Sequence, residues 1–97
     1  MSVTVTVLFP TKAEESDNFW NALIGVLPET RAYDGCISVS THRDLDDASK
    51  IFLIEVWETR EQQGKYLAWR VETGLMDAIG PMLAGAPVFS SYSNPGD

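Results

Sequence analysis

Two side chains suited to an anionic ligand, Tyr66 and Arg70, lie four residues apart in the segment Tyr66-Leu-Ala-Trp-Arg70. If this segment is helical, that spacing places both on one face of the helix. A guanidinium can stabilise a phenolate or an enolate, and a neighbouring phenol can orient that anion or exchange a proton with it. The structural alternative is a tyrosine tipped towards water and an arginine paired with Glu72 or another carboxylate. Tyr66 and Arg70 are therefore the candidate catalytic pair, with both interpretations open.

Glu55 is the one charged residue inside the apolar run 51–57, Ile-Phe-Leu-Ile-Glu-Val-Trp. Buried carboxylates are unusual without a partner. Burial would raise the pKa of Glu55 and suit it to act as a general base. A pairing with Arg31, with Arg70 or across a dimer would instead make it structural, and we favour that role. Trp57 and Trp69 complete the candidate substrate-binding residues, with packing the simpler role for Trp57 and an interface anchor the alternative for Trp69.

One cysteine and one histidine restrict the metal and redox chemistry of this chain. Cys36 alone excludes an internal disulfide and a Cys-rich zinc site, and no basic cluster lowers its pKa, so we expect a small buried hydrophobe. His42 has only the polar loop residues Asp44 and Asp46 as nearby acidic groups, which predicts a surface residue. With no glycine-rich phosphate loop, the sequence predicts no metal, haem or flavin cofactor.

Composition narrows the classes of partner. Fourteen acidic and seven basic residues give a net charge of −7. Nucleic-acid binders need clustered Lys and Arg, and scattered basic residues make polynucleotides and anionic membranes poor partners. No apolar run approaches the ~20 residues that span a bilayer, and the first residues lack the basic region of a signal peptide. We expect a cytoplasmic location and a single domain over residues 1–97, with a core from about 3 to 92 and a flexible tail at 93–97.

Local patterns predict the elements that position these residues. Alternating Val and Thr from Val3 onwards indicates a strand that ends near Pro10. Thr11, with Glu14 three residues on, predicts a capping box that opens a helix reaching about Arg31. A proline at position 28 should end or kink that helix.

The rest of the chain adds three strands and a second helix. Strands are expected over 36–42, 51–57 and 88–92, and a helix over 59–73 with Thr59 as its N-cap. Gly74 interrupts that helix, which then continues to about residue 79. The order β-α-β-β-α-β is the split arrangement of a ferredoxin-like α+β fold, with one four-stranded antiparallel sheet and both helices on the same side.

The strand at 51–57 carries apolar side chains on both faces, whereas a strand in a small sheet is normally buried on one side only. We assign to the surface beneath the helices Val3, Val5, Val7, Ile37, Val39, Phe52, Ile54 and Val56. The opposite surface receives Thr4, Thr6, Leu8, Cys36, Ser38, Ser40, Ile51, Leu53, Glu55 and Trp57. The second surface is too apolar to leave in water. A homodimer in which two sheets pack face to face is therefore predicted.

Three segments in this layout, Thr30-Arg-Ala-Tyr-Asp-Gly-Cys36, Glu55-Val-Trp57 and 66–70, resemble the antibiotic biosynthesis monooxygenase (ABM) domain family over roughly residues 3–92. The resemblance implies a dimeric α+β barrel with a pocket in each subunit between sheet and helices. Some members oxidise aromatic polyketides with molecular oxygen and no metal or flavin. Others degrade haem, isomerise small metabolites or have no known activity.

This sequence departs from the haem-degrading pattern. That branch has an Asn on the first strand, a Trp nine residues after the strand-end Trp, and a His about ten residues later. Here the first strand has only Thr and Val at the inner positions, and Tyr66 and Met76 occupy the other two places. Many other relatives carry His where Tyr66 stands, so that base is also missing. Haem cleavage is not expected.

The function that the resemblance implies is a cofactor-independent monooxygenase that acts on a small aromatic or polyketide-like metabolite. Two alternatives remain open. One is a non-enzymatic dimer that binds a small ligand or serves as an assembly module, and the other is a proton-transfer isomerase that needs no oxygen.

Overall fold

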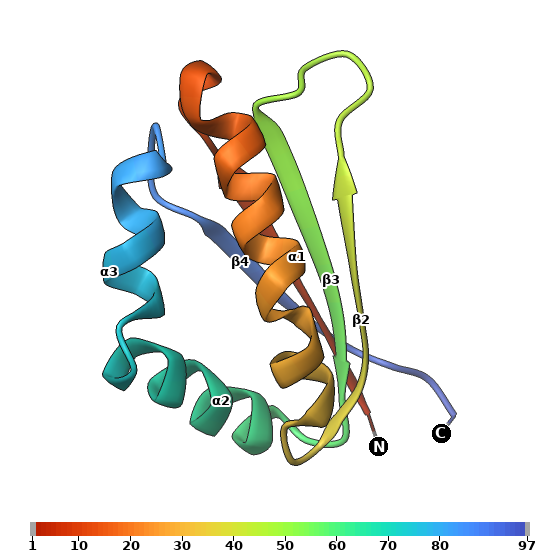
Figure 1. Cartoon of the computed structure of the whole chain (residues 1–97). Coiled ribbons are helices and arrows are strands. Elements are labelled where there is room, and N and C mark those ends of the chain that lie inside the picture. Colours follow the sequence, from red (N-terminus) through yellow and green to blue (C-terminus); the bar gives the residue numbers. More distant parts are fainter. Residues whose placement is uncertain (1, 97) are drawn as a thin grey trace.

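The chain folds as a four-stranded antiparallel sheet with helices on one face, as the pattern of strands and helices predicts (Figure 1). The computed structural model describes residues 2–96; Met1 and Asp97, the two ends of the predicted 1–97 domain, lie outside them. The elements in chain order are β1 (Val3–Pro10), the 3-10 turn η1 (Ala13–Glu15), α1 (Ser16–Ala32), β2 (Cys36–Arg43), β3 (Lys50–Trp57), α2 (Arg60–Glu72), α3 (Leu75–Ile79), the 3-10 turn η2 (Gly80–Met82) and β4 (Val88–Ser93).

The strands lie in the order β2-β3-β1-β4, so the two central strands are those with the most apolar residues. β1 pairs with β3 from Val3 opposite Trp57 to Pro10 opposite Lys50. α1 crosses the sheet, while α2 and α3 meet at an angle beside it (Figure 1). The core forms where α1 packs on the inner faces of β1 and β3. Its fully buried members include Phe19, Val5, Val7, Ile51 and Trp57.

The predicted start of the first helix is wrong. Thr11 is buried and its hydroxyl donates to the Ser49 carbonyl at 2.8 Å, so it fastens the end of β1 to the β2–β3 loop instead of capping a helix. α1 begins at Ser16 and runs without a break through Pro28 to Ala32. By contrast, the predicted cap of the second helix is confirmed, since the Thr59 hydroxyl accepts from the Gln62 amide.

The assignment of sheet faces is also wrong for β3. Val5 lies opposite Glu55 and Val7 opposite Leu53, so the odd-numbered residues of both strands share the helix-covered face. Phe52, Ile54 and Val56 therefore belong to the open face, together with Thr4, Thr6 and Leu8. A register irregularity between Cys36 and Ser38 shifts the phase of β2. It leaves Ile37 56% exposed and keeps Cys36 against the core.

The corrected assignment makes the open face more apolar at its centre than expected. Three consecutive outward side chains of β3 are Phe52, Ile54 and Val56, and Leu8 pairs with Phe52 on the neighbouring strand. At the edge strands this face carries Tyr92, which is 55% exposed, and Val88, which is 57% exposed. No helix of residues 2–96 covers this face (Figure 1).

The C-terminal end of the described chain is fastened to β1. Asn94 accepts a hydrogen bond from the Thr4 hydroxyl at 2.7 Å and donates to the Ser2 hydroxyl at 2.8 Å. The first part of the predicted flexible tail, Ser93, belongs to β4. The last residue of that tail lies outside the described residues.

Candidate functional site

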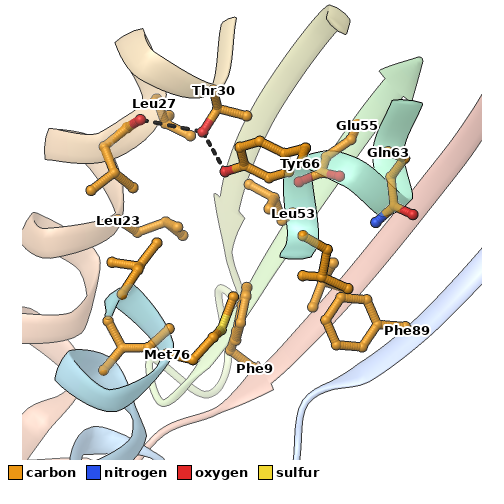
Figure 2. Close-up of a pocket in the computed structure, with 15 residues that line it drawn as sticks. Phe9, Leu23, Leu27, Thr30, Leu53, Glu55, Gln63, Tyr66, Met76 and Phe89 are labelled. Atoms are coloured by element: carbon orange, nitrogen blue, oxygen red, sulfur yellow. Dashed lines mark hydrogen bonds between the residues drawn. The ribbon is translucent and has the colours of Figure 1, made fainter. Parts of the chain in front are cut away.

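A small cavity lies between the helices and the sheet (Figure 2). Its volume is about 40 Å³. The lining is mostly apolar, with Glu55, Thr30, Gln63 and Tyr66 as the polar members. The apolar lining comes from every layer of the fold: Val7, Phe9, Leu53 and Phe89 from the sheet, Leu23, Val26 and Leu27 from α1, and Leu67, Leu75, Met76 and Ile79 from α2 and α3. We call this space the inner pocket.

Glu55 brings a carboxylate to the wall of the inner pocket from the centre of β3. The residue is 3% exposed. Burial raises the pKa of this carboxyl above its ordinary value, and the hydrogen bond from Trp57 opposes that rise. Trp57 Nε1 donates to Glu55 Oε1 at 2.9 Å and is the one hydrogen-bond donor to this carboxylate within residues 2–96. A carboxylate whose pKa is raised in a water-poor pocket is a stronger base than an exposed carboxylate and is suited to accept a proton.

The ion pair expected for Glu55 is absent within the described chain. Arg31 instead donates to the Val39 carbonyl at 3.4 Å, and Arg70 pairs with Glu29. The structural role that the sequence favoured therefore lacks its intrachain partner. A general base in an apolar environment fits the surroundings of Glu55, and a pairing across a dimer stays a prediction.

Tyr66 and Arg70 do meet on one face of α2, as their spacing predicts. Arg70 Nε donates to Tyr66 Oη at 2.9 Å, and Tyr66 Oη lies 2.7 Å from Thr30 Oγ1. The Thr30 hydroxyl in turn lies 3.2 Å from the Val26 carbonyl, which can only accept. Either hydroxyl can donate in the bond between Tyr66 and Thr30, and the Val26 carbonyl also accepts from Arg70. Figure 2 shows the tyrosine hydroxyl aimed at Thr30 on α1.

Arg70 itself is 4% exposed and has partners on α1 as well as on its own helix. Its Nη2 donates to the Val26 carbonyl at 3.0 Å and to Thr30 at 3.2 Å. Its Nη1 lies 3.4 Å from Glu29, a side chain that is 62% exposed. The pairing expected with Glu72 or another carboxylate is thus made with Glu29, and Arg70 joins α2 to α1.

A second hollow, the outer groove, lies on the other side of Arg70. It has a volume of about 370 Å³ and is lined by Val26, Glu29, Trp69, Arg70, Thr73, Gly74, Leu75 and Ala78. The Arg70 guanidinium stacks over the Trp69 ring, 4.6 Å from its centroid. Trp69 therefore walls the outer groove and not the inner pocket.

The five predicted site residues form one contiguous cluster, although only two of them line the inner pocket. Trp57 is fully buried, with its ring centroid 5.1 Å from that of Tyr66, and it acts on the pocket through Glu55. Tyr66 and Trp69 lie 6.1 Å apart between ring centroids. Glu55 and Tyr66 line the inner pocket, and Arg70 contacts Tyr66 from the side of the outer groove.

Sequence reasoning missed two polar residues of the inner pocket, Thr30 and Gln63. Thr30 had a signal, because it continues the buried stripe of Phe19, Leu23 and Leu27 at helical spacing, and a polar residue on such a stripe is unusual. Gln63 had one as well, because it lies three residues before Tyr66 and four before Leu67, on the side of α2 that faces the pocket.

Of the other reactive side chains, Cys36 lies beside this cluster, opposite Trp57 in the pairing of β2 with β3. His42 is exposed and its ring is hydrogen-bonded to Ser40 at 2.9 Å, as expected for a surface residue. Burial and the nearby Glu55 carboxylate raise the pKa of the Cys36 thiol, which opposes thiolate formation. No group of three or more metal-ligating side chains occurs within residues 2–96. In the same range, no helix is long and apolar enough to cross a bilayer.

The antibiotic biosynthesis monooxygenase family matches residues 2–71, from β1 to the end of α2. The chain belongs to this family. No curated protein sequence matches the chain.

Solved structures share the fold. A Mycobacterium tuberculosis protein, Rv0793, superposes with a TM-score of 0.87 at 18% identity, covering 100% of this chain and 98% of that one. A variant of SnoaB, described as a cofactor-independent oxygenase from Streptomyces nogalater, gives a TM-score of 0.82 at 14% identity, covering 99% and 95%. A conserved protein from Methanosarcina mazei gives 0.87 at 16% identity, covering 97% and 93%. At these identities the likeness concerns the fold alone.

Proposed function

We propose that the protein is a cofactor-independent monooxygenase that acts on a small aromatic or polyketide-like metabolite. The observation that carries the proposal is Glu55: a buried carboxylate with a raised pKa, no cation paired to it within residues 2–96, and a place on an apolar pocket wall. Membership of the family adds support, as does the description of SnoaB as a cofactor-independent oxygenase.

In this proposal Glu55 is the general base. It removes a proton from an acidic C–H or O–H group of a phenolic or anthrone-like substrate. The resulting substrate anion supplies the electrons that reduce molecular oxygen. The apolar lining excludes water from the anion and strengthens its electrostatic interactions. The Trp57 indole donates to Glu55 at 2.9 Å and holds its carboxyl group in one position, both with and without the transferred proton.

Arg70 is proposed to stabilise the anion, and Tyr66 to position Arg70. The tyrosine hydroxyl accepts from Arg70 and is hydrogen-bonded to Thr30, so both of its hydrogen-bond partners are residues of this chain. Tyr66 is therefore better suited to orienting the guanidinium than to exchanging a proton with a substrate. Trp69 supplies an aromatic wall of the outer groove, and Trp57 packs against the Tyr66 ring.

We further propose a homodimer in which two open sheet faces pack together. The outward apolar row Phe52, Ile54 and Val56, with Leu8 beside it, would otherwise remain in water. Family members are generally dimeric. Sedimentation at micromolar concentration should give twice the 10.7 kDa chain mass, whereas a folded monomer would contradict the proposal.

Oxygen uptake coupled to substrate loss tests the catalytic proposal. Phenols and anthrones would be screened with a dissolved-oxygen electrode, using the parent protein, Glu55→Gln and the matched control Glu58→Gln, whose carboxylate lies just beyond β3 on the exposed surface. Removing a general base typically costs about 10²–10⁴-fold in rate. We expect that loss in Glu55→Gln alone; equal turnover in all three proteins would remove Glu55 from the mechanism.

The proton-transfer isomerase is the second candidate, because Glu55 supports it equally well. Both reactions begin with removal of a proton and differ only in whether the anion meets oxygen. Substrate loss at an unchanged rate in the absence of oxygen would favour the isomerase over the oxygenase. Stoichiometric binding with no turnover of any panel member would favour a binding module.

A further inference from the structure

The inner pocket is too small for the class of ligand that the proposed function requires. Its volume is about 40 Å³, whereas a cavity that accommodates benzene in another protein measures roughly 150 Å³. The outer groove, at about 370 Å³, falls within the roughly 300–1,000 Å³ of ordinary small-molecule sites. The carboxylate lies in the small space, and the guanidinium lines the large one.

Two side chains separate these spaces, because Val26 and Leu75 line both of them. Val26 lies within the long helix α1. Leu75 is the first residue of α3, a helix of five residues, and directly follows Gly74, whose φ of 88° places it in the left-handed region. A partition at the start of so short a helix, after a glycine, can move at less cost than one in the middle of α1.

We propose that the inner pocket and the outer groove form a single binding site for a flat aromatic anion, with Leu75 as its movable partition. The ring system lies beside Glu55, and the anionic oxygen lies in the groove against Arg70. This inference deepens the proposed function, since it names the ligand class and the residues that select it.

Glu29 currently occupies the position proposed for the anion. Its carboxylate is 3.4 Å from Arg70 Nη1, a long contact, and its side chain is 62% exposed. The other donors of Arg70 that make contacts point inwards, to Tyr66, Thr30 and the Val26 carbonyl. Nη1 is therefore the part of the guanidinium that a ligand can reach, by displacing a solvent-exposed carboxylate that contributes little to stability.

A pair of dyes that differ by one anionic group tests the charge selection. 8-Anilinonaphthalene-1-sulfonate carries a sulfonate in place of the ligand's anionic oxygen, and N-phenyl-1-naphthylamine has the same rings without it. Glu29→Gln should free Arg70 and tighten sulfonate binding by about tenfold, the worth of a charge-assisted hydrogen bond. Binding of the uncharged dye should not change.

Glu72→Gln is the matched control for charge. It removes one exposed carboxylate from α2 outside both spaces. We expect no more than the small general gain in anion affinity that follows from one fewer negative charge. Equal gains in Glu29→Gln and Glu72→Gln, or no gain in either, would overturn the assignment of the groove to the anionic group.

Leu75→Ala and Met76→Ala test the partition. Both shorten an apolar side chain that lines the inner pocket, but only Leu75 also lines the groove. Stopped-flow mixing with the sulfonate dye should show several-fold faster association for Leu75→Ala and a rate close to the parent's for Met76→Ala. Near-ultraviolet circular dichroism would establish native packing, and Leu75→Val would replace the alanine variant if that fails to fold.

Equal association rates in Leu75→Ala and Met76→Ala would overturn the partition. All these measurements use dye binding without turnover. They can therefore fail while Glu55→Gln still abolishes oxygen uptake, and they can succeed in a protein that consumes no oxygen.

Discussion

Arg70 and Glu55 are the two most deeply buried charged residues described, and their surroundings differ in kind. Arg70 donates to Tyr66, to Thr30 and to a carbonyl of α1, meets a carboxylate, and stacks on Trp69. Glu55 receives one hydrogen bond, from Trp57. A buried charge with many partners holds elements together, whereas one with a single donor has its pKa displaced and is available for proton transfer. The contrast distinguishes a charge that several partners hold in place from a carboxyl group that is available to exchange a proton.

The largest expected effect is on the stability of the Arg70 region. Arg70→Ala removes the donor to the Tyr66 hydroxyl, one of the donors to the Val26 carbonyl and the guanidinium that joins α2 to α1. Leaving one buried polar group unsatisfied typically costs about 1–3 kcal/mol. Urea denaturation should show a loss at the upper end of that range or beyond it, because several contacts of Arg70 are lost at once. Arg60→Ala, an exposed change on the same helix, should cost less than about 0.5 kcal/mol, and similar costs for the two variants would remove the contrast.

A smaller effect is expected from the hydroxyl that links the two regions. Tyr66→Phe keeps the ring that lines the pocket and removes the acceptor of Arg70 Nε and the hydrogen-bond partner of the Thr30 hydroxyl. Leaving buried polar partners unsatisfied costs about 1–3 kcal/mol. In a double-mutant cycle with Thr30→Val, the free energies of unfolding should be non-additive. Strict additivity would mean that the hydroxyls of Tyr66 and Thr30 do not interact.

Glu55 should give the free energy of unfolding a pH dependence. Its carboxyl is protonated more readily in the folded chain than at its ordinary pKa of 4.5. The protonated form therefore favours folding, and the free energy of unfolding should fall as the pH rises from about 4.5 through the raised folded pKa. Each unit of elevation corresponds to about 1.4 kcal/mol. Glu55→Gln should flatten this part of the profile. A parent profile that rises over the same interval would contradict burial as the dominant cause.

The smallest effect concerns the indole that restrains Glu55. Its hydrogen bond to Glu55 lowers the pKa of the carboxyl and partly offsets the rise caused by burial. Trp57→Phe removes that bond, so the pKa of Glu55 should rise further. Carboxyl carbon NMR against pH would report the midpoint directly, independently of any loss of packing. A midpoint unchanged or lowered would show that the indole does not restrain the carboxylate.

Local rules predicted most of the fold. The alternation of Val and Thr predicted β1, Thr59 predicted the start of α2, and Gly74 predicted its end. These predictions succeeded because each feature depends on residues that are close in the chain. The predicted capping box at Thr11 failed, because the Thr11 hydroxyl bonds to Ser49, 38 residues away. Pro28 was accommodated inside α1, and packing of that helix on the sheet outweighs the local preference.

In the candidate site, too, local rules predict some features and others depend on the tertiary structure. Tyr66 and Arg70 could be paired from their spacing, since helix geometry alone makes them neighbours. Their partners could not be found, because Glu29 and Val26 lie 41 and 44 residues away from Arg70 on another helix. The wall formed by Leu75, Met76 and Phe89 lies beyond the family match at 2–71 and depends on how α3 and β4 fold back.

The sequence by itself determined the order of elements, the antiparallel α+β class and the neighbourhood of Tyr66 and Arg70. The tertiary structure decided which side of β3 faces the helices. That strand is apolar at nearly every position, so period-two alternation has no preferred phase, and only its pairing with β1 selects one. The choice buries Glu55 beneath the helices instead of on the open face, and so it decides where the candidate base lies.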